Sequence, residues 1–400
     1  MFQKVAQLIQ RSAVFVLLLL TLAAVAAFAA VNHLVTRYNL NQQARGRRLY
    51  AQGHADMDAG NPNLAIEEFR AALTCDRTNP QYQLSLGRAL RDTGRLDEAE
   101  SYLQSLWERT PEDGTINLAL ARVAARRGNL DEATRYYHNA MYGVWTDDAD
   151  ANRRKARFEF IEFLLQKNAL LQARSELVAL AAFLPPDPAP HLRAAQLLMQ
   201  AQDYLDALAE YEKVLRLDRG NPSALAGAGE AAFQSGHYRT AHGYLQGAIN
   251  ANPQDVASRA LHDSANLILE TDPFIHRISD AERNRRISSD FDNAGQRLAA
   301  CAQQKDVALT AATTGGAPGL AAVARPGSAA PSPLAQLNAR WLEMKRQMPH
   351  LRSPGETDLP DAIMDLVFQI EQQTSAECGE PQGVDEALLL ISRNREAADQ

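Results

Sequence analysis

A regular spacing of small and large apolar residues runs through the middle of this chain of 400 residues. Alanine recurs every 34 residues, with one gap of 40, at Ala65, Ala99, Ala133, Ala173, Ala207 and Ala241. A bulky apolar or aromatic residue follows each alanine by four positions: Phe69, Leu103, Tyr137, Leu177, Tyr211 and Leu245. Small side chains let two helices approach closely, and the bulky neighbour fills the remaining groove. The pattern therefore predicts packed helix pairs, repeated along residues 46–255.

Each helix pair contains a predicted turn between its two helices. Glycine occupies this turn in four of the six pairs and Asn168 in the fourth, and both residue types tolerate a left-handed backbone. Gln202 takes the place in the fifth pair, so we expect that turn to be the least secure. The longer gap corresponds to six extra residues, Asp148–Arg153, which we expect to lengthen a helix or a loop before the fourth pair.

The repeats resemble the tetratricopeptide pattern in both length and residue type. The match is closest in the second unit, at Gly87, Gly94, Ala99 and Pro111, and in the sixth, at Gly229, Gly236, Tyr238, Ala241, Ala248 and Pro253. The resemblance covers about half of the chain. It implies an all-α fold, a right-handed α-solenoid of six helix-turn-helix units whose concave groove is lined by the first helix of each unit. It implies no particular activity, because such arrays bind many partners.

The N-terminal segment is apolar enough to enter a membrane. Residues 13–31 carry no charge, and as a helix they would span about 28 Å, close to the hydrocarbon thickness of a bilayer. We interpret residues 1–37 as a transmembrane anchor; a cleaved signal peptide is the alternative, because Ala27 and Ala29 have the spacing of a cleavage site. Lys4 and Arg11 favour a cytoplasmic N-terminus and a periplasmic array at the inner membrane, although arginines after the span nearly balance them.

The residues after the array divide into three predicted segments. Residues 256–303 are expected to form capping and post-array helices, 304–333 a flexible linker rich in Ala, Gly and Pro, and 334–400 a small helical region. We expect this last region to dock on the helix around Phe291 or on the end of the array. Cys301 and Cys378 could form a disulfide in an oxidising compartment, and they would be free thiols in the cytoplasm.

The sequence contains no signature of catalysis or of metal binding. The net charge of -7 gives no reason to expect a nucleic-acid partner, and no C-x-x-C, H-E-x-x-H, G-x-S-x-G or phosphate-loop motif occurs. We therefore predict no enzyme activity, no cofactor, no metal and no small-molecule substrate. An enzyme within 334–400 is an alternative, but Cys378 and His350 stand isolated there.

A group of arginines is the strongest candidate for a partner site. Arg88 and Arg91 in the second unit, and Arg122 and Arg126 in the third, have the spacing of residues on one helical face. If these helices line the groove, the guanidinium groups face one surface, which suits an acidic peptide or a carboxyl terminus. The alternative is a solvated basic face, partly neutralised by Asp92 and Glu98.

Other inward positions differ from those of known carboxylate-binding arrays. Tyr50 and His54 stand where the tetratricopeptide domains of chaperone co-factors have Lys and Asn, so binding to a chaperone tail is not expected. Phe158, at an inward position of the fourth unit, is apolar.

From the apolar N-terminal segment, the repeats and the groove residues together, we predict a membrane-anchored scaffold that binds a protein or peptide partner in its groove. The alternative is an envelope-assembly or regulatory factor whose array faces the cytoplasm and acts on a membrane enzyme.

Overall fold

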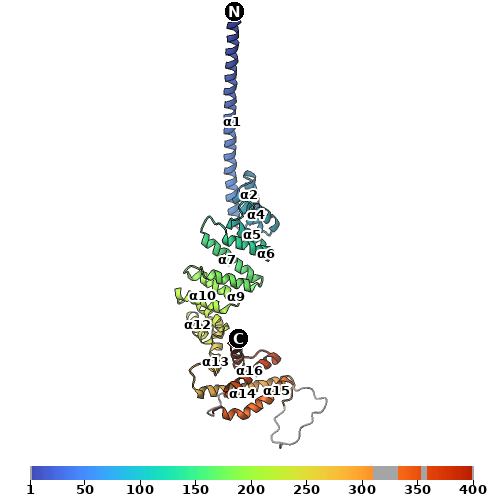
Figure 1. Cartoon of the computed structure of the whole chain (residues 1–400), viewed down its shortest axis with the longest axis vertical. Coiled ribbons are helices and arrows are strands. Elements are labelled where there is room, and N and C mark those ends of the chain that lie inside the picture. The colour runs from blue at the N-terminus through green and yellow to red at the C-terminus, as the bar shows by residue number, and fades with distance from the viewer. Residues whose placement is uncertain (1, 310–331, 353–357, 399–400) are drawn as a thin grey trace. The chain divides into compact units, whose positions relative to one another are not determined.

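The computed structural model describes residues 2–309, 332–352 and 358–398 (Figure 1). Within these ranges the chain is helical and contains no β-strand, which confirms the all-α prediction. The chain divides into two compact bodies, an N-terminal body (Met1–Glu176) and a C-terminal body (Leu177–Gln400). The predicted linker at 304–333 lies for the most part outside the described residues.

The N-terminal body is built from antiparallel helix pairs. Its helices are α1 (Phe2–Asp58), α2 (Pro62–Cys75), α3 (Pro80–Asp92), α4 (Leu96–Trp107), α5 (Gly114–Arg127), α6 (Leu130–Tyr142), α7 (Ala149–Gln166) and the start of α8 (Leu170–Ala181). Each helix packs on the next from α1 to α7. The repeated alanines and their bulky partners form one core. A methyl group on Gly87 would lie 2.9 Å from the Leu103 side chain, so the small residue is required for the close approach.

The turns inside the helix pairs share one backbone conformation. Gly60, Gly94, Gly128 and Gly236 all have a φ angle between 76° and 79°. Asn168 and Gln202 adopt the same left-handed region, with φ angles of 56° and 59°. The fifth turn therefore has the geometry of the others, although we expected the lack of glycine to weaken it. Buried Ala201 and Ala207 on either side hold the chain in this turn against the cost of the conformation.

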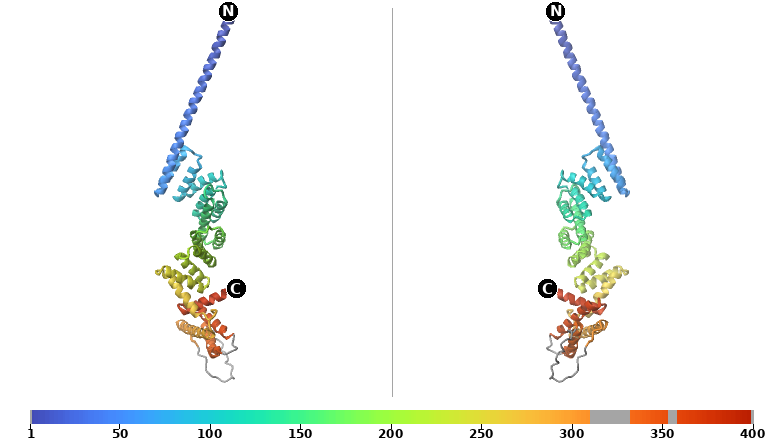
Figure 2. Two further views of the ribbon diagram at one scale, coloured as in Figure 1. Left: turned by 90° about the vertical axis from the view of Figure 1, so that its left-hand side faces the viewer. Right: turned by 90° about the vertical axis from the view of Figure 1, so that its right-hand side faces the viewer.

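Helix α1 joins the apolar N-terminal segment to the first repeat without a break. Residues 38–45, between the predicted anchor and the first repeat, are a continuous part of the helix (Figure 2). The sequence contains no glycine or proline before Gly46, so nothing interrupts it. From Val16 to Asp58, α1 contains a stretch long and apolar enough to cross a membrane, and its large apolar side chains from Val16 to Val31 are exposed.

The six extra residues before the fourth repeat lengthen a helix. Helix α7 has 18 residues, whereas α3 and α5 have 13 and 14. Asp148 precedes α7 and accepts a hydrogen bond from the Ala151 backbone N–H, which satisfies a donor at the exposed helix start. The extra residues therefore project the start of α7 beyond the register of the preceding helices.

The C-terminal body continues the repeats and adds a helical cluster. The rest of α8 is followed by α9 (Pro188–Gln200), α10 (Tyr204–Leu217), α11 (Pro222–Gln234), α12 (Tyr238–Ala251), α13 (Val256–Thr271), α14 (Asp280–Gln304), α15 (Pro333–Gln347), a short 3-10 helix (Met348–Arg352), α16 (Leu359–Cys378) and α17 (Val384–Ala398). Helices α13 to α17 share one hydrophobic core. The residues around 256–303 and those after 332 therefore fold together.

The C-terminal helices dock at both positions that we expected. Trp341 on α15 stacks on Phe291 of α14, with ring centroids 5.2 Å apart, and its indole N–H donates to the Phe291 carbonyl oxygen. At the other end, the Asn394 side chain on α17 donates to the carbonyl oxygen of Gly236, in the turn of the sixth repeat. The end of the array is thus covered by the same helices that pack on α14.

Candidate functional site

Arg122 forms an ion pair with an acidic residue of the same array. It lies on α5, and its guanidinium group donates two hydrogen bonds to Glu159 of α7, at 2.7 and 2.8 Å. Burial lowers the pKa of Arg122, but the bidentate bond to Glu159 more than offsets this and raises the pKa. The charge of Arg122 is therefore largely compensated within the array.

Two further arginines are close to Asp92. Arg91 donates to the Asp92 carboxylate at 2.7 and 2.8 Å, and Arg126 lies 4.0 Å from the same group. Glu98, which we expected to help neutralise this face, is engaged elsewhere, with Arg70 and Arg95. Asp92 is thus the shared counter-charge for the two arginines.

Arg88 is the cation that this arrangement leaves without a counter-charge. Among the described residues its guanidinium group has no hydrogen bond and no ion pair, and its Nε atom is buried. Burial lowers the pKa of Arg88, and the neighbouring charges of Arg122 and Arg91 lower it further. An arginine keeps its charge even so, and a half-buried cation without a partner is unfavourable. This position is therefore prepared to receive an anion.

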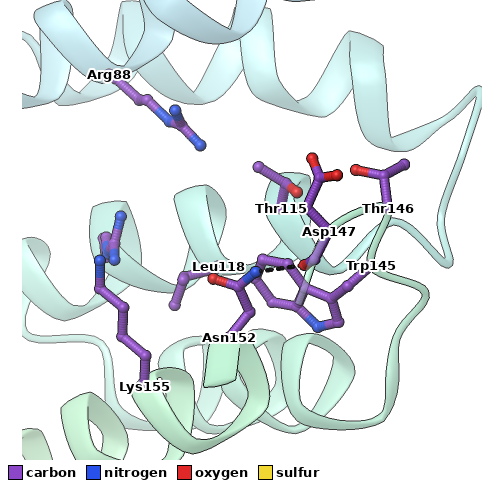
Figure 3. A pocket seen from close by; sticks show the side chains of 9 residues that line it. Arg88, Thr115, Leu118, Trp145, Thr146, Asp147, Asn152 and Lys155 are labelled. Carbon is purple, nitrogen blue, oxygen red and sulfur yellow. Dashed lines mark hydrogen bonds between the residues drawn. The ribbon is translucent and has the colours of Figure 1, made fainter. Parts of the chain in front are cut away.

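Arg88 contributes to a pocket between α3, α5 and the start of α7 (Figure 3). The pocket has a volume of about 280 Å³ and is lined by Arg88, Thr115, Leu118, Arg122, Trp145, Thr146, Asp147, Asn152 and Lys155. Figure 3 shows the Arg88 side chain reaching in from one side and Asn152 and Lys155 from the other. Lys155 makes no hydrogen bond or ion pair with a described residue, so two cations of this pocket are available to a ligand.

The loop that closes the pocket is held rigidly. The Gly114 N–H donates to the Val144 carbonyl oxygen and the Val144 N–H to that of Glu112, both at 2.8 Å. Trp145 packs directly on Gly114, where a Cβ atom would lie 2.4 Å from the indole ring. The indole N–H of Trp145 also donates to the Ala140 carbonyl oxygen at 2.9 Å. The lining residues are therefore positioned before any ligand arrives, which reduces the entropy lost on binding.

The remaining predicted groove residues have structural contacts. Tyr50 and His54, on the part of α1 that belongs to the first repeat, both lie within 3.3 Å of the Ser85 hydroxyl on α3. Their rings also pack against each other and against Phe69. Phe158 is 5% exposed. These three residues stay predicted groove positions, but their contacts stabilise the array, and the pocket is lined by others.

The sequence interpretation missed most of the pocket. Thr115, Asn152 and Lys155 were not singled out, although the six-residue insertion was a visible signal close to them. A departure from the repeat length marks a place where the groove surface changes. Lys155 lies two residues after the insertion, and Asn152 lies within it.

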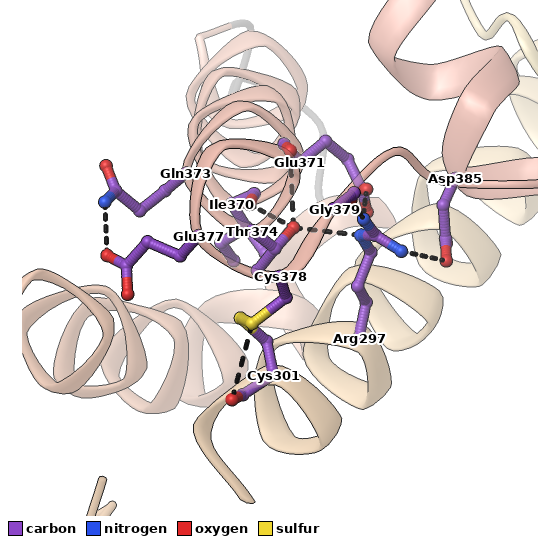
Figure 4. The surroundings of a disulfide bond; sticks show 10 residues. All are labelled: Arg297, Cys301, Ile370, Glu371, Gln373, Thr374, Glu377, Cys378, Gly379 and Asp385. Carbon is purple, nitrogen blue, oxygen red and sulfur yellow. Dashed lines mark hydrogen bonds and ion pairs between the residues drawn. A yellow bond between two sulfur atoms is a disulfide. The ribbon is translucent and has the colours of Figure 1, made fainter. Parts of the chain in front are cut away.

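The structure also joins Cys301 and Cys378 by a disulfide bond, with their Cα atoms 5.7 Å apart (Figure 4). Next to this bond, Arg297 on α14 donates to the Thr374 hydroxyl and to the Gly379 carbonyl oxygen, and it lies 3.2 Å from Glu371 on α16. Burial and the nearby charge of Asp385 raise the pKa of Glu371 to about 8. Covalent and polar contacts therefore fasten α16 to α14 side by side. Among the described residues, no group of three or more His, Cys, Asp or Glu side chains is placed to hold a metal ion.

The helix pairs and their glycine-containing turns define the class of this protein as an α-solenoid. Tetratricopeptide repeat families match residues 50–114 and 84–149, and residues 198–263. The chain thus contains tetratricopeptide repeats over these residues, as the sequence pattern predicted. Proteins of this kind bind other proteins. In a comparison with curated protein sequences, no relative matches the chain.

Solved structures share the repeat fold at low sequence identity. The structure of PilF from Pseudomonas aeruginosa is 15% identical, with a TM-score of 0.39, and the match covers 56% of this chain and 99% of that one. PilW, described as a type IV pilus biogenesis factor, is 17% identical with a TM-score of 0.39, over 53% and 96% of the two chains. A repeat protein from Cytophaga hutchinsonii is 15% identical with a TM-score of 0.44, over 60% and 93%. These likenesses concern the fold.

Proposed function

We propose that this protein is a membrane-anchored scaffold that binds an acidic segment of a partner protein in the groove of its N-terminal body. The observation that carries the proposal is Arg88, a half-buried cation that has no counter-charge beside two other arginines. A carboxylate from a partner would supply the missing charge through charge-assisted hydrogen bonds. Arg91 and Arg126 share the single carboxylate of Asp92, so this face keeps a net positive charge that steers an acidic chain toward the groove.

Residues 13–31 of α1 support a membrane anchor. Side chains from Val16 onward are exposed along an apolar helix, which is the expected state of a helix that lies in lipid. The disulfide between Cys301 and Cys378 fits a compartment where such bonds persist. We therefore propose an inner-membrane protein whose repeats face the periplasm. An anchored groove raises the local concentration of its partner at the membrane surface.

The groove proposal is tested by photo-crosslinking in native membranes. A photoreactive amino acid replaces Arg126, whose side chain is exposed, and the same substitution at Arg135 on α6 serves as the control. We expect an adduct with an acidic partner only from position 126, and we expect the adduct to disappear in the Arg88→Ala variant. A second variant, with Arg122→Gln and Glu159→Gln together, removes an arginine without leaving its carboxylate unpaired. Adducts that survive both variants would contradict the proposal.

The orientation is tested separately, by labelling an introduced cysteine near the C-terminus in intact cells with a reagent that cannot cross the inner membrane. Labelling without permeabilising the inner membrane supports a periplasmic array. Labelling only after the inner membrane is opened would support the alternative, a regulatory factor that acts from the cytoplasm.

A further inference from the structure

The pocket beside Arg88 contains groups that select among anions. It presents two cations without partners, Arg88 and Lys155, and a third, Arg122, whose charge is paired with Glu159. Asp147 is a lining residue of the same pocket and carries a negative charge. The lining groups and Glu159 together bring three positive and two negative charges. The excess among these five groups is a single positive charge, which one carboxylate neutralises.

The remaining lining groups also suit a planar carboxylate. Arg88 offers a forked donor that matches the two oxygens of a carboxylate, and the Thr115 hydroxyl and the Asn152 amide add neutral polar groups. Leu118 and Trp145 provide apolar surface for the methylene groups that carry such a carboxylate. A phosphate group at neutral pH carries close to two negative charges and would meet Asp147 as a repulsive neighbour.

The extra residues before the fourth repeat complete this arrangement. Asn152 belongs to the added helical turn, and its amide donates to the Asp147 carbonyl oxygen at 2.8 Å, so the added turn is tied to the loop that contains Asp147. Arg153, also within the insertion, donates to the Gly143 carbonyl oxygen at 3.2 Å and holds the other end of that loop. The insertion therefore places Lys155 and Asp147 on opposite sides of one cavity.

We infer that the pocket lined by Arg88, Asp147 and Lys155 is a subsite for one carboxylate group of the bound peptide, and that Asp147 excludes phosphorylated peptides. This inference rests on the proposed function, since it names the chemical group that the groove selects. Arg88 and Lys155 contact the carboxylate. Asp147 sets the charge that the pocket accepts.

The test measures fluorescence anisotropy of labelled peptides with the full chain in detergent micelles. The peptides share a glycine-serine backbone and an amidated C-terminus, and carry glutamate, phosphoserine or glutamine at the same positions. We expect the glutamate peptide to bind more tightly than the phosphoserine peptide and the glutamine peptide to bind weakest. Arg88→Ala and Lys155→Ala should each weaken glutamate binding roughly tenfold or more, the loss of one charge-assisted hydrogen bond. The control variant Arg135→Ala removes a charge from α6 and should change the affinity for the glutamate peptide by less than about twofold.

The Asp147→Asn variant directly tests whether Asp147 excludes phosphorylated peptides. It removes one negative charge from the exposed loop, and we expect it to raise the affinity for the phosphoserine peptide until it equals or exceeds that for the glutamate peptide. A glutamine peptide with a free C-terminus distinguishes the source of the carboxylate: binding as tight as that of the glutamate peptide assigns the pocket to a chain terminus. Helical circular dichroism confirms that each variant is folded.

The outcomes separate the two proposals. If no glutamate peptide binds the natural protein, the acidic-peptide function fails. If the glutamate peptide binds but Arg88→Ala and Lys155→Ala leave its affinity unchanged, the groove function stands and the pocket assignment fails. Tighter binding of the phosphoserine peptide to the natural protein overturns the selection for a carboxylate.

Discussion

Arg297 on α14 lies 3.2 Å from Glu371 on α16, yet the pKa of Glu371 is raised to about 8. The carboxylate is fully buried, and both of its oxygens lack a hydrogen bond within the described structure. Burial disfavours the charged form more than a single arginine favours it, and Asp385 competes for the same arginine. Glu371 therefore holds a proton at neutral pH, whereas in an unfolded chain it would release that proton near pH 4.5.

Because folded Glu371 keeps this proton, we predict that the C-terminal body becomes less stable as the pH rises. Between pH 4.5 and 8 the folded state keeps a proton that the unfolded state has lost, so the free energy of unfolding falls across this interval. For one buried carboxyl group, this decrease in the free energy of unfolding is on the order of 3–5 kcal/mol. In the Glu371→Gln variant, much of the decrease should be absent. Hydrogen exchange of α16 at several pH values measures it. An unchanged pH slope in the variant would exclude Glu371 as the cause.

Reduction of the Cys301–Cys378 disulfide should loosen the contact between α14 and α16. The bond closes a segment with a sequence separation of 77 residues, and the chain-entropy model assigns roughly 4 kcal/mol to such a loop. The double variant Cys301→Ser, Cys378→Ser should speed hydrogen exchange in α16 and α17. Cys75→Ser is the matched control, because Cys75 is a free thiol in the N-terminal body. Equal exchange in both variants would show that packing alone holds these helices.

Two glycine-to-alanine substitutions should have opposite effects. Gly87→Ala places a methyl group 2.9 Å from the buried Leu103 side chain, so that side chain or helix α4 must shift, at a cost of about 1–3 kcal/mol. Gly243 lies on α12 with nothing within 4 Å of its added Cβ atom, so Gly243→Ala should stabilise its helix by about 0.5–1 kcal/mol. Local hydrogen exchange in α3 and α12 gives both values. Stabilisation by Gly87→Ala would contradict the close-packing account of the repeat.

The start of α7 should depend on its capping residue. Asp148 has a φ angle of 36° and its side chain accepts a hydrogen bond from the Ala151 N–H. Asp148→Ala removes this bond and keeps the unfavourable backbone, so we expect a cost of about 1 kcal/mol and faster exchange in residues 149–153. Asp148→Asn should keep most of the protection, because Asn accepts the same bond. Equal exchange in the two variants would mean that the cap contributes little.

The repeat fold could be predicted because each unit obeys the same local rules. Alanines, bulky partners and turn glycines recur at fixed spacing, so Ala99 and Leu103 alone reveal how one helix meets the next. The pocket could not be predicted in this way, because Arg88 and Lys155 lie far apart in sequence and line one pocket only through the longer α7. The pairing of Arg122 with Glu159 was also hidden, since nothing in the spacing indicates which acid faces which arginine. Gln202 shows a third limit, because burial of its neighbours overrides the preference for glycine.

The uninterrupted course of α1 has a mechanical consequence for a chain anchored as we propose. A helix turns by about 100° and rises by about 1.5 Å with every residue. The direction in which the N-terminal body faces, and its height above the bilayer, are therefore set by the number of residues between the membrane and Gly46. One residue added within 32–45 would rotate the entire groove by more than a quarter turn without altering any contact inside it. The length of the helix thus fixes the direction in which the binding surface faces around the helix axis.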